Sequence, residues 1–453
     1  MIKLDEVKIT KDMQDLIRCR TVSNRDESLV DRKEFSKLYT LLEERFPALY
    51  AVCRPEHVGK TGLVFRISGN DAQQLPHGVQ AEKKNSVCRC AVLMAHYDVV
   101  PVVEKEWKKP PFDAVIEDGV MWGRGTLDTK GTFCAILESV NEELAAGWKP
   151  QNDMYLSFSG EEEIDGSSCT DIVSWFEKQG IHPDFVLDEG GAIVEKAFPG
   201  VQGRCAMIGV AEKGSVNINC TTESPGGHAS APPAHSAAGY IAMAAQALEN
   251  HPYKTQLTRP VKEMIDVLAP GKKLLFKTAF RLFGRKIGGE VNAMMHTTCA
   301  VTRLAGSSAY NVLPHTASLG MNVRLLGTDT IDTMLSHMKK AVNRIERKNK
   351  IQLSFNVVNG MNPSIVSDTH CPQWDNLRGT ILKTWPGVIV SPYLMMACSD
   401  SRHYCRITDK VYRFSAMYMS KEDRGLIHGN NERIALPTLF EAVRFYCNLL
   451  ETL

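Results

Sequence analysis

The sequence predicts an α/β fold: a mainly parallel, mixed sheet flanked by helices, with a smaller α+β domain inserted into it. Three observations lead to this prediction. Nearly continuous apolar runs at residues 87–95, 154–158 and 185–187 are typical of strands buried on both faces of a sheet. A helical repeat of apolar residues separates the first two runs. Beyond residue 191 the strand-like segments instead alternate apolar and polar residues, which is typical of a sheet with one solvated face.

The length of the chain supports two domains. Its 453 residues are three times the usual single-domain length of about 150. The change of strand pattern places the boundaries near residues 205 and 360. We therefore expect a discontinuous domain of residues 1–204 and 361–453, interrupted by a domain of residues 205–360.

The elements of the larger domain follow in order. Residues 13–46 are polar with an intermittent apolar stripe, which predicts helices. A helix is expected over 129–146, because its apolar residues recur at spacings of three and four and Gly147 offers a left-handed stop. Cys88 and Cys90 alternate within the first buried strand, so we interpret both as small core residues.

The inserted domain has a different texture. We expect strands at 215–221, 297–304 and 318–325 and helices at 235–249 and 330–347, while residues 252–292, with a basic stretch at 281–286, lengthen the insert. The densest basic run, 339–350, overlaps the second helix. Apolar residues recur there at helical spacing, so a solvated helix face is expected rather than a nucleic-acid surface.

Composition excludes several classes of partner. Lys plus Arg minus Asp plus Glu is 53 − 52 = +1, and 43% of the residues are hydrophobic, which is ordinary for a globular protein. No nucleic-acid or membrane partner is therefore expected. No apolar segment reaches the roughly 20 residues that span a bilayer, and the N-terminus lacks a secretory pattern. Thirteen scattered cysteines favour a reducing compartment, so we predict a cytoplasmic protein.

Acidic and histidine side chains follow the predicted buried strands. These are His96 and Asp98, Asp128 at the start of a helix, the acids at 161–163, and Asp188 with Glu189. Taken singly, they have ordinary explanations: a local hydrogen bond, an N-cap or a surface acidic run. Together they gather at the carboxyl ends of strands, where α/β proteins bind ligands. Carboxylates packed this closely repel one another unless cations neutralise them, so the pattern indicates bound metal.

Five ordered motifs, at 96–98, 125–131, 161–166, 187–190 and 427–433, resemble the di-zinc family of aminoacylase, carboxypeptidase S and bacterial glutamate carboxypeptidase. The resemblance runs from about residue 60 to the end of the chain. Segments 292–295 and 310–314 are most similar to the carboxypeptidase S and N-acyl-amino-acid hydrolase branch. The resemblance implies a zinc-peptidase-like sheet with an inserted lid and dimerisation domain.

The resemblance also implies roles for individual residues. Asp128 would bridge two Zn²⁺ ions, for which Co²⁺ or Mn²⁺ could substitute. The remaining metal ligands would be His96 and Asp188 at one ion, and Glu163 and His428 at the other. Asp98 would hold the His96 ring, and Glu162 rather than Glu161 would be the general base that deprotonates a metal-activated water. Imidazole and carboxylate are ligands that zinc accepts.

Residues of the insert resemble the family's substrate-holding positions. His228, in a Gly/Pro-rich loop, would donate to the oxyanion of the reaction intermediate, although a histidine in such a loop can be purely structural. Asn311 and Arg324 would hold the substrate, Arg324 by gripping a carboxylate, with an edge-strand solubility role as the alternative. Arg402 would bind carboxylate or pair with Asp400. His182 and His403 are interpreted as structural.

The predicted function is hydrolysis of the amide bond of an N-acyl amino acid, or of a short peptide with a free C-terminal carboxylate. Alternatives are a desuccinylase or dipeptidase of the same family, or a non-catalytic protein that binds acyl amino acids or peptides. The resemblance implies a homodimer formed through the lid. It leaves open the preferred acyl group, the physiological metal, the arginine that meets the carboxylate, and whether His228 acts in its own subunit or across the dimer.

Overall fold

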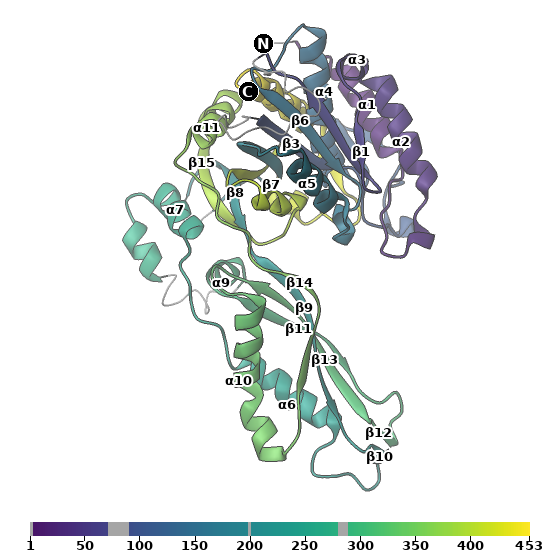
Figure 1. Ribbon diagram of the computed structural model, residues 1–453, viewed down its shortest axis with the longest axis vertical. Coiled ribbons are helices and arrows are strands. Elements are labelled where there is room, and N and C mark those ends of the chain that lie inside the picture. The colour runs from purple at the N-terminus through teal and green to yellow at the C-terminus, as the bar shows by residue number, and fades with distance from the viewer. Residues whose placement is uncertain (1–2, 71–89, 198–200, 280–288) are drawn as a thin grey trace. The chain divides into compact units, whose positions relative to one another are not determined.

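The computed structural model describes residues 3–70, 90–197, 201–279 and 289–453 (Figure 1). The chain forms two compact units. Unit 1 comprises residues 1–210, 367–393 and 399–453, and unit 2 comprises residues 211–366 with the short stretch 394–398. This short return to unit 2 is a feature that the sequence pattern did not indicate.

Unit 1 is built on an eight-stranded mixed sheet with the order β1-β2-β6-β3-β7-β16-β8-β15. The four central strands run parallel: β6 (Asp153–Ser159), β3 (Cys90–His96), β7 (Phe185–Glu195) and β16 (Val411–Tyr418). On one side, β1 (Glu56–Val58) and β2 (Gly62–Ile67) add antiparallel strands; on the other lie β8 (Arg204–Glu212), antiparallel, and β15 (Ile389–Met395). The predicted α/β class with a mainly parallel centre is confirmed. Of the strand expected at 87–95, residues 87–89, including Cys88, lie outside the described residues.

Helices cover both faces of this sheet. On one face α4 (Lys130–Ala145) packs against β3 and against α13 (Leu436–Leu450), α1 (Glu6–Ile17) and α3 (Pro47–Val52). On the other, α5 (Ser168–Gln179) packs on β1, β2 and β6, where Val92 and Met94 meet Ile172 and Phe176. The remaining helices of the unit are α2 (Arg32–Arg45), α11 (Pro372–Thr384) and α12 (Lys421–Arg424).

The first helix begins earlier than the apolar pattern indicated. The prediction of helix from residue 13 was wrong about this start, because Asp5 accepts a hydrogen bond from the Lys8 backbone N–H at 3.0 Å and caps α1 at Glu6. The helix predicted over 129–146 is confirmed as α4.

A small three-stranded sheet joins distant parts of unit 1. It has the order β17-β5-β4, from β17 (Arg433–Ala435), β5 (Val120–Trp122) and β4 (Val115–Glu117). Arg433 pairs with Trp122 in antiparallel register. The motifs at 125–131 and 427–433 are therefore brought next to each other.

Unit 2 is an antiparallel sheet covered by two helices on one face. Its strand order is β11 (Thr298–Ala305), β13 (Thr316–Leu325), β9 (Gly214–Glu223) and β14 (Ser354–Met361). The helices α6 (Ala237–Glu249) and α10 (Ile331–Asn349) share one apolar core with these strands. Met338 and Val342 of α10 are buried, which confirms that the basic run at 339–350 is one face of an amphipathic helix.

The rest of the insert is short elements. They are the pair β10 (Gly227–His228) and β12 (Val312–Leu313), and the helices α7 (Arg259–Leu268) and α9 (Gly289–Met295). The basic residues 281–286 lie outside the described part of the chain.

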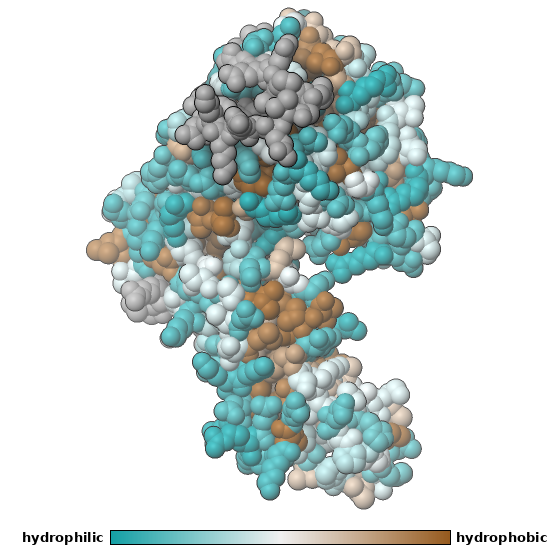
Figure 2. All heavy atoms as spheres, viewed as in Figure 1, coloured by the Kyte–Doolittle hydropathy of each residue, from teal (hydrophilic) through white to brown (hydrophobic). Residues whose placement is uncertain are grey.

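The surface of each unit is mostly hydrophilic in Figure 2, with hydrophobic side chains in small groups on unit 1 and in a larger group on the visible face of unit 2. Within the described residues, no helix combines the length and the apolar character needed to cross a membrane. Twelve cysteines are described, and all are free thiols.

Candidate metal centre

His96 ends the central strand β3 and is buried. Its Nδ1 lies 3.0 Å from the backbone carbonyl oxygen of Asp98. Because a carbonyl oxygen only accepts, Nδ1 carries the proton and the other nitrogen, Nε2, is left to face Asp128 Oδ1 at 3.0 Å. Burial alone lowers the pKa of His96, but the hydrogen bonds to Asp128 and Asp98 outweigh it and raise that pKa well above its usual value. A cation is thus favoured at Nε2.

Asp128 stands between two histidines. While Oδ1 faces His96, Oδ2 lies 3.0 Å from His428 Nε2. Burial works against the charged carboxylate, yet the contacts with His428 and His96 lower the pKa of Asp128. The side chain does not cap α4, whose N-cap residue is Thr129, and the Asp128–Thr129 peptide is cis. One carboxylate with a separate oxygen for each imidazole is the arrangement that a bridging ligand needs.

The acidic turn after β6 supplies the next carboxylates. Its short helix η3 (Glu162–Ile164) is held by Asp98, whose two carboxylate oxygens accept the backbone N–H groups of Glu162 and Glu163, each at 3.2 Å. Glu163 Oε2 lies 2.9 Å from His428 Nε2. The other oxygen, Oε1, is buried and has no hydrogen-bond partner among the described residues.

Asp98 therefore has two tasks. Its backbone oxygen fixes His96, and its carboxylate, with Oδ1 3.4 Å from His96 Nδ1, orders the turn that carries Glu162 and Glu163. The sequence analysis anticipated only the contact with His96.

Several further acids are buried close to these side chains. Burial, reinforced by neighbouring acids, raises the pKa values of Glu162 and Glu189 well above the usual range. Burial also raises the pKa of Asp188, whose Oδ2 accepts the backbone N–H of Ser401 at 3.1 Å, and that of Asp400 to about 7. Neither Glu189 nor Asp400 was given a role at the metal centre, although Glu189 lies within the motif at 187–190 and Asp400 was considered as a partner of Arg402.

These residues fit a metal centre. One ligand atom each from His96, Asp128 and Glu163 lie within 4.8 Å of one another. The imidazole–carboxylate separations of 2.9–3.0 Å are close to the roughly 3.3 Å between neighbouring ligand atoms in a tetrahedral zinc site with bonds of about 2.05 Å. His428 has its pKa raised to about 10 by Asp128 and Glu163, so a positive charge is stabilised where a metal ion would sit.

His428 lies in a loop that two buried residues hold in place. Its backbone has φ 59°, in the left-handed region that non-glycine residues rarely adopt. Arg124 Nη2 donates to the carbonyl oxygens of His428 at 3.3 Å and Gly429 at 3.0 Å, and Arg124 Nη1 donates to Glu432 Oε2 at 2.7 Å. The sequence analysis missed this pair: Glu432 lies in the motif at 427–433, but neither Glu432 nor Arg124 was given a role.

The predicted substrate-holding residues fall in both units. In unit 2, His228 and Asn311 lie near each other at the β10–β12 pair, where the Ala229 N–H donates to the Asn311 carbonyl at 3.0 Å. Arg324, also in unit 2, donates from Nε to Asn322 Oδ1 at 3.1 Å and from Nη1 to Cys398 Sγ. Arg402 belongs to unit 1, in the short helix η4 (Asp400–Arg406), and is nearly buried.

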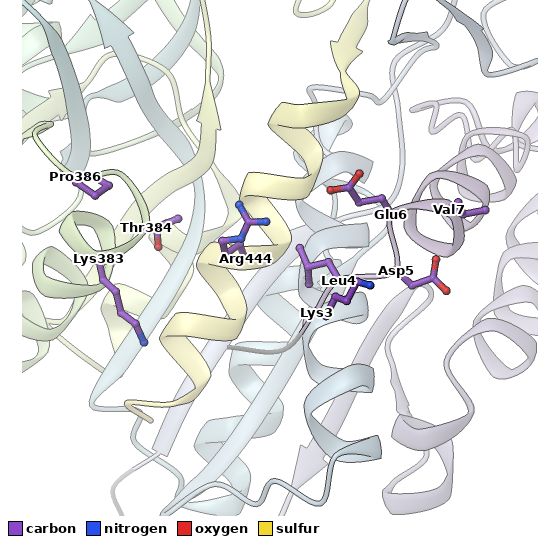
Figure 3. A pocket seen from close by; sticks show the side chains of 9 residues that line it. All are labelled: Lys3, Leu4, Asp5, Glu6, Val7, Lys383, Thr384, Pro386 and Arg444. Atoms are coloured by element: carbon purple, nitrogen blue, oxygen red, sulfur yellow. The ribbon is translucent and has the colours of Figure 1, made fainter.

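A cavity of about 960 Å³ lies elsewhere in unit 1 (Figure 3). It is lined by Lys3, Leu4, Asp5, Glu6, Val7, Lys383, Thr384, Pro386 and Arg444, none of which is a predicted site residue. Its cationic side chains are exposed, and Lys383 is paired with Glu451. Ordinary solvation accounts for this charged surface.

The strand ends of a parallel-centred sheet, together with the loop of His428, gather the imidazole and carboxylate groups that a metal-dependent hydrolase uses. Residues 92–452 match the model of peptidase family M20/M25/M40, and the chain belongs to that family. It is thus an enzyme of the metallopeptidase and amidohydrolase class.

Relatives cover almost the whole chain. It is 30% identical over 463 residues to the probable carboxypeptidase S-like 2 of Dictyostelium discoideum, covering 99% of this chain and 85% of that protein. It is 29% identical over 448 residues to the N-fatty-acyl-amino acid synthase/hydrolase PM20D1 of Homo sapiens, covering 95% and 84%.

Solved structures share the fold. The M20 family metallo-carboxypeptidase Sso-CP2 from Sulfolobus solfataricus superposes with a TM-score of 0.68 at 17% identity, covering 99% of both chains. Human carnosine dipeptidase 1 gives a TM-score of 0.66 at 11% identity, covering 98% of this chain and 95% of that one.

Proposed function

We propose that this protein is a two-metal, zinc-dependent hydrolase that cleaves the amide bond of N-acyl amino acids or short peptides with a free carboxylate. The observation that carries the proposal is the chain of contacts His96–Asp128–His428–Glu163, in which each imidazole Nε2 faces a carboxylate at 2.9–3.0 Å. The relatives named carboxypeptidase S-like and N-fatty-acyl-amino acid synthase/hydrolase support the substrate class.

The ligand assignment extends this chain of contacts. Asp128 would bridge the two ions, with His96 and Asp188 completing one site and Glu163 and His428 the other. Bound there, the ions would polarise the scissile carbonyl and lower the pKa of a water molecule. Their positive charge would also offset the buried carboxylates of Glu162, Asp188 and Glu189, whose pKa values are raised chiefly by burial.

Glu162 is proposed as the general base. Its backbone N–H is fixed by Asp98, and its carboxyl group interacts electrostatically with His96 and Asp128. The contacts that link His96, Asp128, His428 and Glu163 do not include this carboxyl group. A carboxyl group whose pKa is raised by burial can take a proton from the attacking water and return it to the leaving nitrogen near neutral pH. His228 would donate a hydrogen bond to the developing oxyanion, and Arg324, with Asn311 and Arg402, would hold the substrate.

A homodimer formed through unit 2 is part of the proposal. Its sheet ends in two strands, β11 and β14, whose side chains are largely exposed. Unpaired edge strands can pair with a second chain. Light scattering coupled to size-exclusion chromatography distinguishes a dimer from a monomer.

Hydrolysis of a matched substrate panel tests the function. Purified, zinc-loaded protein is incubated with N-acyl amino acids of increasing chain length, with dipeptides, and with the same acyl amino acids blocked as carboxamides. Release of free amino acid from the unblocked substrates, with much slower cleavage of the carboxamides, is expected. Metal-loaded protein that binds acyl amino acids but releases no product would instead support the non-catalytic alternative.

A further inference from the structure

We propose that the buried pair Arg124 and Glu432 positions the two loops that carry Asp128 and His428, and so sets the affinity of the metal ion that His428 holds. The inference rests on the proposed function, because it assumes that these two residues are metal ligands. Neither Arg124 nor Glu432 is a candidate ligand itself.

The Glu432 carboxylate accepts the hydrogen bonds that hold the loop of Asp128. Oε2 accepts from Arg124 Nη1 at 2.7 Å and from the Gly125 N–H at 3.1 Å. Oε1 accepts the N–H groups of Leu127 at 2.7 Å and of Asp128 at 3.1 Å. The backbone of the bridging residue is therefore hydrogen-bonded directly to a side chain from the far end of the sequence.

Arg124 holds the other side. One terminal nitrogen binds Glu432, and the other donates to the carbonyl oxygens of His428 and Gly429. The guanidinium also lies over the Trp107 ring at 5.2 Å, and both charged side chains are 2% exposed or less. Because the guanidinium group is planar and its N–H groups point in fixed directions, a buried arginine fixes both the orientation and the distance of the groups that it binds.

The backbone of His428 gives a reason for such a support. A non-glycine residue with φ 59° is strained, and strained conformations persist only where the surroundings impose them. Backbone pairing already docks the segment next to β5, since Gly123 N–H donates to the Glu432 carbonyl at 2.9 Å. In the His428–Gly429 peptide, the Gly429 N–H donates to the Leu426 carbonyl at 2.8 Å, and Arg124 adds the hydrogen bond to the His428 carbonyl.

The Arg124–Glu432 pair should affect the two proposed ions to different extents. The backbones of Asp128 and His428 are both hydrogen-bonded to the pair, whereas His96, at the end of β3, is hydrogen-bonded to Asp98. Loosening the pair should therefore weaken binding of the ion at Glu163 and His428 most, because both the Asp128 and the His428 loops are held by the pair. Binding of the ion at His96 and Asp188 should change much less, because the pair reaches that ion only through the Asp128 backbone. Residues that orient metal ligands typically change metal affinity by about 10–100-fold when they are replaced.

The test is a titration of metal-free protein with Co²⁺ and with Zn²⁺, followed by absorbance and calorimetry. Arg124→Lys keeps the positive charge but cannot reach Glu432 and the two carbonyls together. We expect it to bind the first equivalent as the wild type does and the second about 10–100-fold more weakly. His428→Ala identifies which equivalent depends on His428.

Two control variants accompany the titration. Asn430→Ala removes a contact of the same loop, Nδ2 to Glu106 Oε2 at 3.0 Å, without touching the peptide units of the ligands. Arg406→Lys makes the same chemical change in an exposed ion pair with Glu177. Both should bind metal as the wild type does.

If Arg124→Lys does not fold, the same titration of Glu432→Asp tests the inference. It keeps the charge but shortens the reach to the Leu127 and Asp128 N–H groups, and it should also weaken the second equivalent. Two unchanged affinities in a folded variant would overturn the inference and leave the proposed function intact. A wild type that binds no second ion and hydrolyses no acyl amino acid would count against the proposed function instead.

Discussion

His428 Nε2 lies 2.9 Å from Glu163 Oε2, yet 54% of the His428 side chain is exposed and only 4% of the Glu163 side chain is. The two proposed metal sites thus differ in their access to solvent. The imidazole of the first site, His96, has a side chain that is only 2% exposed.

This difference predicts two rates of metal loss. A chelator added to the loaded enzyme should remove the ion held by His428 first, because its ligand can turn into solvent, and the ion at His96 more slowly. Stopped-flow detection of the released metal should show two phases. Glu163→Gln should abolish the fast phase only; a single phase in the wild type with both ions released together would contradict the prediction.

Replacing the proposed base should separate catalysis from metal binding. Glu162→Gln is expected to lower kcat about 100- to 10,000-fold, the usual contribution of general acid–base catalysis, with metal content unchanged. Glu161→Gln is the matched control, because it makes the same change one residue earlier, outside the proposed ligands and base, and this variant should retain most activity. Metal analysis and steady-state kinetics on both variants measure this, and normal turnover by Glu162→Gln would exclude the role.

Arg324 should determine the preference for a free carboxylate. Arg324→Met is expected to raise KM about 10- to 100-fold for unblocked substrates, because a charge-assisted hydrogen bond contributes roughly 1.5–3 kcal/mol. Carboxamide substrates should be affected much less. Arg303→Met, on the adjacent strand β11, serves as the control. An equal loss on both substrate types would assign Arg324 a structural role.

A buried acid outside the metal centre predicts how stability depends on pH. Glu138 on α4 accepts from Lys8 Nζ at 2.6 Å, and burial raises its pKa from 4.5 to about 8. Since the folded state binds the proton more tightly than the unfolded state, the stabilising effect is complete below pH 4.5 and is lost as the pH rises toward 8.

Denaturant unfolding measures this effect. Between pH 5 and 8 the unfolding free energy of the wild type should fall relative to that of Glu138→Gln. The control is Glu142→Gln, one turn further along α4 and 3.8 Å from the same lysine, but partly exposed. Parallel curves for wild type and Glu138→Gln over this range would contradict the prediction.

The clustering of acids at the strand ends could be predicted from the sequence. Buried parallel strands are recognisable in a sequence as apolar runs, and the carboxyl ends of such strands lie at one edge of the sheet. His96 and the acids at 161–163 follow two of these runs, so they were expected to lie near one another. The family model and the fold comparisons agree with the class of enzyme that these motifs indicated.

The supporting contacts could not be predicted in this way. Arg124 and Glu432 are 308 residues apart, and only the pairing of β17 with β5 brings them together. Asp98 was expected to hold His96 through its carboxylate, but whether a backbone or side-chain oxygen is nearer depends on the local turn. Local sequence patterns carry neither the register of distant strands nor the geometry of such turns.

The discontinuity of unit 1 has a consequence for biosynthesis. Its sheet begins with β1 and is completed by β16, and His428 follows that strand after the whole of unit 2 has been made. A nascent chain on the ribosome therefore presents Asp128, Glu163 and their acidic neighbours well before the imidazole and the arginine-bound loop that complete the site. Capture of the proposed ion at Glu163 and His428 is thus expected to be late, because His428 emerges only with the last segment of the polypeptide.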